Sequence, residues 1–301
     1  VSCVAILILE TKCLAPSKTT YQTSARVTSH LRMSSIKKKS FDSKRKNASR
    51  KFVRKPKKPI VMSTASTLQV LYEDNHIIAV NKRSSDIIQG DGKDDMSLCE
   101  VVAEYVAKKY SKPGKAFIGT VHRLDRPVSG VILYAKTSKA LSRLTTMFRH
   151  REIQKTYWAV VKPTINPPED HIVNYLKKNS KLNKSYAHSR PGDDRKEAEL
   201  MYKVLGQSDH YTFVEVLPKS GRHHQIRVTL ASLGSPIKGD VKYGARDIND
   251  NASVHLHARR IDFIHPVKQE AITIIAPPQE DQLWDEFIAL DLKLQKLLNK
   301  K

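Results

Sequence analysis

Residues 117–136 read FIGTVHRLDRPVSGVILYAK, a polar segment held between two apolar runs. The flanking runs, FIGTV and VILYAK, are short and rich in β-branched and aromatic residues, which predicts a strand on each side. The segment between them, residues 122–130, contains a proline and a glycine, as turns do. Because the two strands would give this loop a rigid support, it is well placed to present functional side chains.

Outward from this loop, short β-rich runs outnumber helical patterns and rarely alternate with them. Strands are expected at residues 68–72, 77–81, 155–161, 199–205, 211–217, 254–264 and 271–276. Helices are expected at residues 97–110, after residue 138, after residue 221, and near the end of the chain, where Leu283, Phe287, Leu290 and Leu294 share a side. This order predicts an α+β fold with a mixed, largely antiparallel central sheet and flanking helices.

Capping residues mark several helix ends. Ser97 and Glu100 have the spacing of a capping box, which predicts a helix beginning next to Ser97. Ser138 is placed to cap the following helix. Gly234 follows the last apolar residue of the helix after residue 221 and is expected to end it.

The charge of the chain is strongly basic and unevenly placed. Its 301 residues carry a net charge of +23, which indicates polyanionic partners. Residues 1–62 hold 16 Lys and Arg against 2 acidic residues, and we interpret them as a disordered basic segment. Three interpretations stay open for this segment: a transit segment, an arm that contacts phosphates, or an upstream extension of the reading frame. Residues 63–301 are expected to form the folded domain of the chain.

The sequence predicts neither a membrane-spanning helix nor a set of disulfide bonds. No run of about 18 apolar residues is present, so no spanning helix is expected. Cys3, Cys13 and Cys99 have no paired spacing, which favours a reducing compartment. A cytoplasmic monomer is therefore expected, or an organelle protein if residues 1–62 are a transit segment.

Asp125 is the first candidate for chemistry. It lies in the loop between the two strands and is flanked by Arg123 and Arg126. Neighbouring guanidinium groups favour an ionised carboxylate, which suits a nucleophile and not a general acid. The alternative is an ordinary surface ion pair.

A second basic cluster, KSGRHHQIR at residues 219–227, lies where a loop enters a helix, and such a helix start attracts anions. Its paired histidines, like His255 and His257, lack the spacing of a zinc site, so no metal is expected. Base deaminase, phosphate-loop and dinucleotide motifs are also missing from the sequence, and no cofactor is expected.

Tyr157 lies in the run KTYWAVV, where alternate side chains face opposite sides of a strand. It could form an aromatic platform for a base taken out of its stack, or it could pack as an ordinary strand residue.

Together, HRLDRPVSGVILYAKT, KTYWAVV, GRHHQIRVTLASLGSPIKGDVKYG and LHARRIDFIHP resemble the RluA family of pseudouridine synthases, over about residues 68–277. The resemblance implies that residues 63–301 form a catalytic domain with the pseudouridine synthase fold and a basic catalytic cleft. It further implies the cofactor-free isomerisation of uridine to pseudouridine in RNA. It also implies that Asp125 is the catalytic aspartate, that Arg222 pairs with it, and that Tyr157 lies beside the target base. Arg123 would help to fill the space of the flipped nucleotide, and Gln225, Ile226 and Arg227 would complete the substrate-binding motif.

Two departures and two alternatives accompany this resemblance. Arg126 stands where many members have Lys, and Thr229 where many have His, but neither removes a proposed catalytic group. The small N-terminal RNA-binding domain of many members is not visible, which leaves ribosomal and transfer RNA equally open as substrates. A non-catalytic RNA-binding protein or chaperone is the main alternative, and a glycosidase-like hydrolase is weaker because no partner acid for Asp125 is evident.

Overall fold

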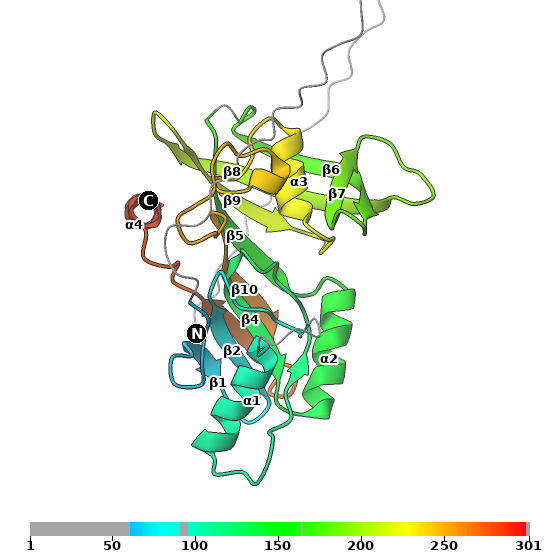
Figure 1. Cartoon of the computed structure of the whole chain (residues 1–301), viewed down its shortest axis with the longest axis vertical. Coiled ribbons are helices and arrows are strands. Elements are labelled where there is room, and N and C mark those ends of the chain that lie inside the picture. The colour runs from blue at the N-terminus through cyan, green and yellow to red at the C-terminus, as the bar shows by residue number, and fades with distance from the viewer. Residues whose placement is uncertain (1–60, 91–95, 164, 299–301) are drawn as a thin grey trace, which may run out of the picture. The chain divides into compact units, whose positions relative to one another are not determined.

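The computed structural model describes residues 61–90, 96–163 and 165–298, all of which belong to one compact unit. Within these residues, eleven strands form a single sheet with the order β1-β2-β4-β10-β5-β9-β8-β6-β7, while β11 pairs with β10 and β3 with β4 (Figure 1). β4 and β10 pair in parallel, and the other paired strands are antiparallel. The predicted α+β fold with a mixed, largely antiparallel sheet is confirmed.

The elements follow the expected order with a few differences in extent. The strands are β1 (Val70–Glu73), β2 (Ile77–Lys82), β3 (Gly119–Thr120), β4 (Ser129–Ala135), β5 (Gln154–Val161), β6 (Glu169–Asn179), β7 (Lys184–His188), β8 (Lys196–Gln207), β9 (Thr212–Pro218), β10 (Leu256–Ile264) and β11 (Ala271–Ile275). The helices are α1 (Leu98–Lys109), α2 (Ser138–Arg149), α3 (Gln225–Ser232) and α4 (Gln282–Leu298), with a short 3-10 helix, η1 (Val241–Tyr243). The predicted segment 1–62 lies almost entirely outside the described residues.

Alternation along β2 and β4 places one helix on each face of the sheet. Ile78 and Val80 pack with α1 on one face, whereas Ile77 and Ala79 pack with α2 on the other. All residues of both strands are buried, because both faces are covered. β2 and β4 are therefore the rigid support beneath the loop that ends at Ser129.

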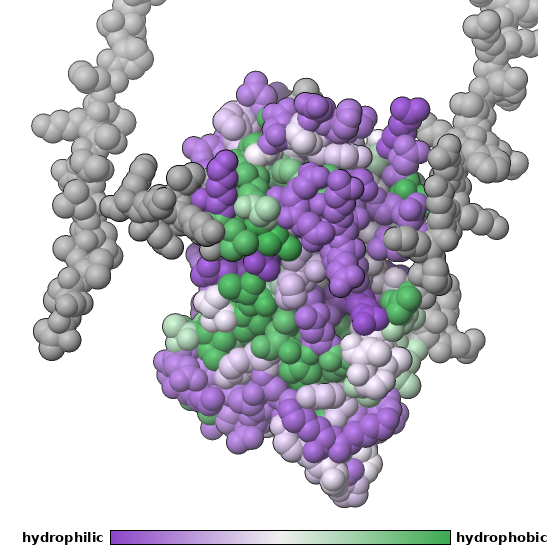
Figure 2. Space-filling model, turned by 90° about the vertical axis from the view of Figure 1, so that its left-hand side faces the viewer, coloured by the Kyte–Doolittle hydropathy of each residue, from purple (hydrophilic) through white to green (hydrophobic). Residues whose placement is uncertain are grey.

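A second pair of helices covers the other half of the sheet in the same way. Ile226 and Leu230 of α3 pack on β5, β8 and β9, while Trp284 and Phe287 of α4 pack against Trp158 on the opposite face. Figure 2 shows the side of the molecule on which α4 lies in Figure 1, where hydrophobic residues gather across the middle of the face. The apolar side of α3 thus holds this helix against the sheet.

Side-chain caps mark the starts of α1 and α2. The Ser97 hydroxyl accepts from the Glu100 N–H, and the Glu100 carboxylate accepts from the Ser97 N–H, so the predicted capping box is confirmed. The prediction for Ser138 is wrong by one residue. Thr137, in extended conformation, accepts from the Ala140 N–H at 3.2 Å, and Ser138 is already helical. Gly234, with φ of 80°, follows the end of α3 as expected.

None of the helices among the described residues is both long and apolar enough to cross a membrane.

Candidate active site

The Asp125 loop is tied down from below by a buried lysine. Lys82, at the end of β2, has no exposed surface, and its ammonium donates to the carbonyl oxygens of Arg83 at 2.8 Å, Arg126 at 3.0 Å and Val128 at 2.7 Å. Burial lowers the pKa of Lys82 to about 7. The Val128 N–H also donates to the Asp125 carbonyl oxygen at 3.0 Å, and this hydrogen bond closes the turn. The backbone from Asp125 to Val128 is therefore held by Lys82 and by the turn itself.

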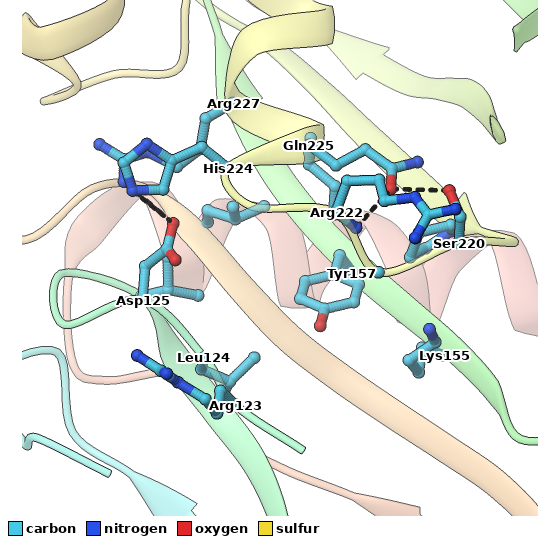
Figure 3. A pocket seen from close by; sticks show the side chains of 15 residues that line it. Arg123, Leu124, Asp125, Lys155, Tyr157, Ser220, Arg222, His224, Gln225 and Arg227 are labelled. Atoms are coloured by element: carbon cyan, nitrogen blue, oxygen red, sulfur yellow. Dashed lines mark hydrogen bonds and ion pairs between the residues drawn. The ribbon is translucent and has the colours of Figure 1, made fainter. Parts of the chain in front are cut away.

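Asp125 pairs with a buried arginine on the first turn of α3. Arg227 Nη1 lies 2.9 Å from Asp125 Oδ2 (Figure 3). The same guanidinium donates to both oxygens of Asp240, at 2.6 and 2.8 Å. Burial opposes the charge of Arg227, but the hydrogen bonds and charges of Asp240 and Asp125 outweigh it and raise its pKa. Arg227 is therefore a permanent cation that holds one oxygen of Asp125.

The expected pair between Asp125 and Arg222 is wrong. Arg222 is exposed, and its Nε donates instead to the Glu197 carbonyl at 2.8 Å. The physical reason lies in the loop before α3: Arg222 precedes the helix, where its N–H donates to the Gln225 side chain at 3.0 Å. The helical turn then brings Arg227, five residues later, to the carboxylate. Arg222 lines the same cavity as Asp125 without contacting it.

Tyr157 and Trp158 lie on opposite sides of β5, as alternation requires. Trp158 is buried against α4, whereas Tyr157 lines the cavity that contains Asp125 (Figure 3). Burial, with a smaller contribution from the charge of Asp125, raises the pKa of Tyr157, so this phenol is neutral. Lys155, two residues earlier, lines the same cavity, and burial lowers its pKa.

Three predicted site residues remain: Arg123 has an exposed side chain, and Gln225 and Ile226 are buried. Arg123 is exposed and lines the cavity. The Gln225 amide donates to the Glu199 carbonyl at 2.9 Å and accepts from the Ser220 hydroxyl at 2.8 Å, so it braces the loop. Ile226 packs in the core under the cavity. All three line the cavity, and their contacts with a substrate stay a prediction.

Two connected hollows meet at Tyr157. The first, of about 110 Å³, contains Asp125, Tyr157 and Arg227. The second, of about 610 Å³, shares Arg123, Lys155, Tyr157 and Arg222 with the first. We call this second hollow the basic groove, because it is lined by six basic residues and no acidic one: Arg123, Arg149, Arg151, Lys155, Lys219 and Arg222. A negatively charged chain could lie in the basic groove while one of its units enters the smaller cavity.

Four site residues were missed by reasoning from the sequence: Lys82, Lys155, His224 and Asp240. Lys155 had a usable signal, since two residues along a strand place it on the same face as Tyr157. Asp240 and Lys82 had none, because each meets its partner through the tertiary fold. Among the described residues, no group of three or more His, Cys, Asp or Glu side chains is placed to hold a metal ion.

Comparisons with known proteins point in one direction. Residues 76–232 match the family model described as RNA pseudouridylate synthase. The chain is 33% identical over 224 residues to ribosomal large subunit pseudouridine synthase C of Buchnera aphidicola subsp. Schizaphis graminum, covering 69% of this chain and 66% of that protein. It is 31% identical over 243 residues to tRNA pseudouridine synthase C of Pasteurella multocida, covering 74% of this chain and 95% of that protein.

A solved structure, human RNA pseudouridylate synthase domain containing 4, shares the fold. Its TM-score is 0.61 at 20% sequence identity, and the match covers 75% of this chain and 94% of the human chain. The pseudouridine synthase fold expected from the sequence is confirmed.

Proposed function

Because this chain belongs to the RNA pseudouridylate synthase family, we propose that it isomerises uridine to pseudouridine in structured RNA, with Asp125 as the nucleophile and no cofactor. The resemblance to the RluA family drawn from the sequence agrees with that membership. The observation that carries the proposal is the placement of Asp125: it is the one carboxylate among the described residues lining the small cavity, beside a neutral tyrosine and a buried arginine.

The reaction balances without any further reactant. The bond between ribose C1′ and uracil N1 breaks, a bond between C1′ and C5 forms, C5 loses its proton, and N1 gains one. Asp125 would form a covalent bond with the ribose or with the base, which divides one hard exchange into easier steps. No atom or electron is left over, so no oxidant, reductant or nucleotide needs to be consumed.

The cavity and the basic groove support an extruded base. A uridine inside a helix cannot reach Asp125, so it must leave its stack and enter the cavity. Tyr157 would lie against the base, because aromatic side chains stack on unstacked nucleotides. Arg123, exposed at the cavity mouth, would take the space that the uridine leaves. The other five basic residues of the basic groove would bind the phosphates on either side.

The names of two relatives indicate which class of RNA is the substrate. One named relative acts on the ribosomal large subunit and another on tRNA. The chain spans about two thirds of the first of these proteins. We therefore propose ribosomal or transfer RNA as the substrate, and a cytoplasmic monomer as its working form.

Nucleoside analysis tests this function. Wild-type protein and the Asp125→Ala variant are incubated with unmodified ribosomal and transfer RNA, without ATP or added metal, and pseudouridine is separated from uridine after digestion. We expect pseudouridine from wild type and none from Asp125→Ala. Asp193→Ala, which changes an exposed aspartate in the described part of the chain, is the matched control and should retain activity. Pseudouridine from Asp125→Ala would contradict the proposal. RNA binding by all proteins without turnover in any would favour the RNA-binding alternative.

A further inference from the structure

His224 is the buried histidine directly before α3, and its two ring nitrogens face different partners. Nδ1 lies 2.8 Å from the Tyr243 hydroxyl, and Nε2 lies 3.6 Å from Asp125 Oδ2. The backbone of His224 has φ of 55°, in the left-handed region, so its surroundings must hold a strained conformation. Figure 3 shows His224 and Arg227 approaching Asp125 from the same side.

Tyr243 determines which ring nitrogen carries the hydrogen. Its oxygen accepts from the Ser185 backbone N–H at 2.8 Å. Its own hydrogen is then left for His224 Nδ1, the other polar atom within hydrogen-bond distance among the described residues. If Nδ1 carried a hydrogen, the buried Tyr243 hydroxyl would have no acceptor, which is costly inside a protein. The neutral ring therefore carries its hydrogen on Nε2, which faces Asp125.

The His224 ring is uncharged at neutral pH. Burial lowers its pKa to about 3, although the charge of Asp125 acts in the opposite direction. The other groups that face it, Arg227, His223 and Lys242, also disfavour a second proton. The ring consequently offers Asp125 a hydrogen-bond donor without adding another positive charge that would weaken the carboxylate as a nucleophile.

We propose that His224 is a positioning residue for Asp125, which holds the carboxylate oxygen Oδ2 together with Arg227 and leaves Oδ1 for the substrate. Both groups approach Oδ2, and no hydrogen bond to Oδ1 occurs within residues 61–90, 96–163 and 165–298. The distance of 3.6 Å is long for a hydrogen bond, and such contacts in empty sites tighten when the substrate is bound. The inference rests on the proposed role of Asp125.

Steady-state kinetics can show whether His224 acts as a hydrogen-bond donor or only fills space. His224→Leu keeps the bulk and removes the donor, whereas His224→Gln retains an N–H near the position of Nε2. Loss of a group that acts mainly in the transition state should lower kcat about tenfold for His224→Leu, with KM within about twofold of wild type. His224→Gln should recover most of that loss. His210→Leu, an exposed site in the β8–β9 turn, is the matched control and should behave as wild type.

Wild-type kcat in His224→Leu, or an equal loss in His224→Gln, would overturn the proposal, because neither result needs a donor at this position.

The tautomer can be observed without turnover. Long-range proton–nitrogen NMR correlations of histidine-labelled wild-type protein, with the His224 signals assigned from His224→Gln, report which ring nitrogen is protonated. We expect one neutral Nε2–H form between about pH 5.5 and 8, where an exposed histidine would titrate. Tyr243→Phe should abolish the strict preference for that form. A wild-type Nδ1–H form, or an imidazolium at pH 7, would overturn the proposal. If wild type makes no pseudouridine, the proposed function fails, and the spectrum still decides whether His224 faces Asp125 as a donor.

Discussion

Replacing Arg227 with methionine should destabilise the protein far more than the same change at Arg222. Arg227 is 5% exposed and Asp240 is 1% exposed, so the change leaves a buried carboxylate without its two charged hydrogen bonds. Breaking a buried ion pair by removing one partner costs about 3–5 kcal/mol. Arg222 is exposed, and substitutions at such sites usually stay within about 0.5 kcal/mol.

Urea unfolding of the full chain measures both effects. The free energy of unfolding should fall by about 3–5 kcal/mol in Arg227→Met with an unchanged m value, since a change in m would signal a different unfolded state. Adding Asp240→Asn to Arg227→Met should restore part of the loss, because the remaining side chain then carries no charge. Arg222→Met is the matched control.

A loss below about 1 kcal/mol in Arg227→Met, or no recovery in the double variant, would show that Arg227 does not compensate a buried charge on Asp240, because an uncompensated buried charge costs more than that. The same proteins also separate the two arginines in catalysis. Turnover should fall strongly in Arg227→Met. In Arg222→Met the weakened contact with RNA should raise KM, while Asp125 keeps its partner.

Three other changes test the fold around the site. Gly130→Ala places a Cβ 2.3 Å from the Ala258 carbonyl oxygen, at a residue whose φ is 117°. This change should lower the free energy of unfolding by more than about 2 kcal/mol in urea titrations. A neutral effect would contradict the close approach of β4 and β10 at this position. Ser97→Ala removes the cap of α1 and should cost about 1 kcal/mol in the same assay, whereas an unchanged midpoint would show that the cap contributes nothing. Burial of Asp74 is outweighed by two backbone N–H donors, a hydrogen bond from Lys268 and the charge of His265, which lower its pKa to about 2. The stabilisation that ionised Asp74 contributes is therefore present above its unfolded pKa of 3.8 and lost as the pH falls toward 2. In acid unfolding, the Asp74→Asn variant should lack this part of the pH dependence. An acid transition identical to that of wild type would contradict the prediction.

The sequence predicted the elements whose pattern is local. Capping-box spacing identified α1, and alternation along residues 155–161 separated Tyr157 from Trp158. β6 and β7 were missed because most of their residues are exposed or only half-buried, so few buried apolar residues mark these strands. Burial on both faces made β2 and β4 easy to recognise as apolar runs.

The partner of Asp125 could not be assigned from local spacing. Arg222 and Arg227 lie five residues apart in one basic motif, and both could reach an anion in an extended chain. The helix start between them decides the pairing: it directs Arg227 toward Asp240 and Asp125, while Arg222 stays in the loop. Asp240, which holds Arg227 in place, lies 13 residues further along the chain, and only the fold brings its carboxylate to the guanidinium.

Attack of Asp125 on the uridine leads to loss of the hydrogen at C5, so release of this hydrogen can be measured to test the role of Asp125. RNA carrying tritium at C5 of its uridines is incubated with wild type and with Asp125→Asn, which preserves shape and removes the charge, while RNA binding is measured on the same samples. We expect tritium in water from wild type only, with RNA affinity retained in the variant and falling with salt in both proteins. Tritium release by Asp125→Asn at the wild-type rate would show that Asp125 is not the nucleophile.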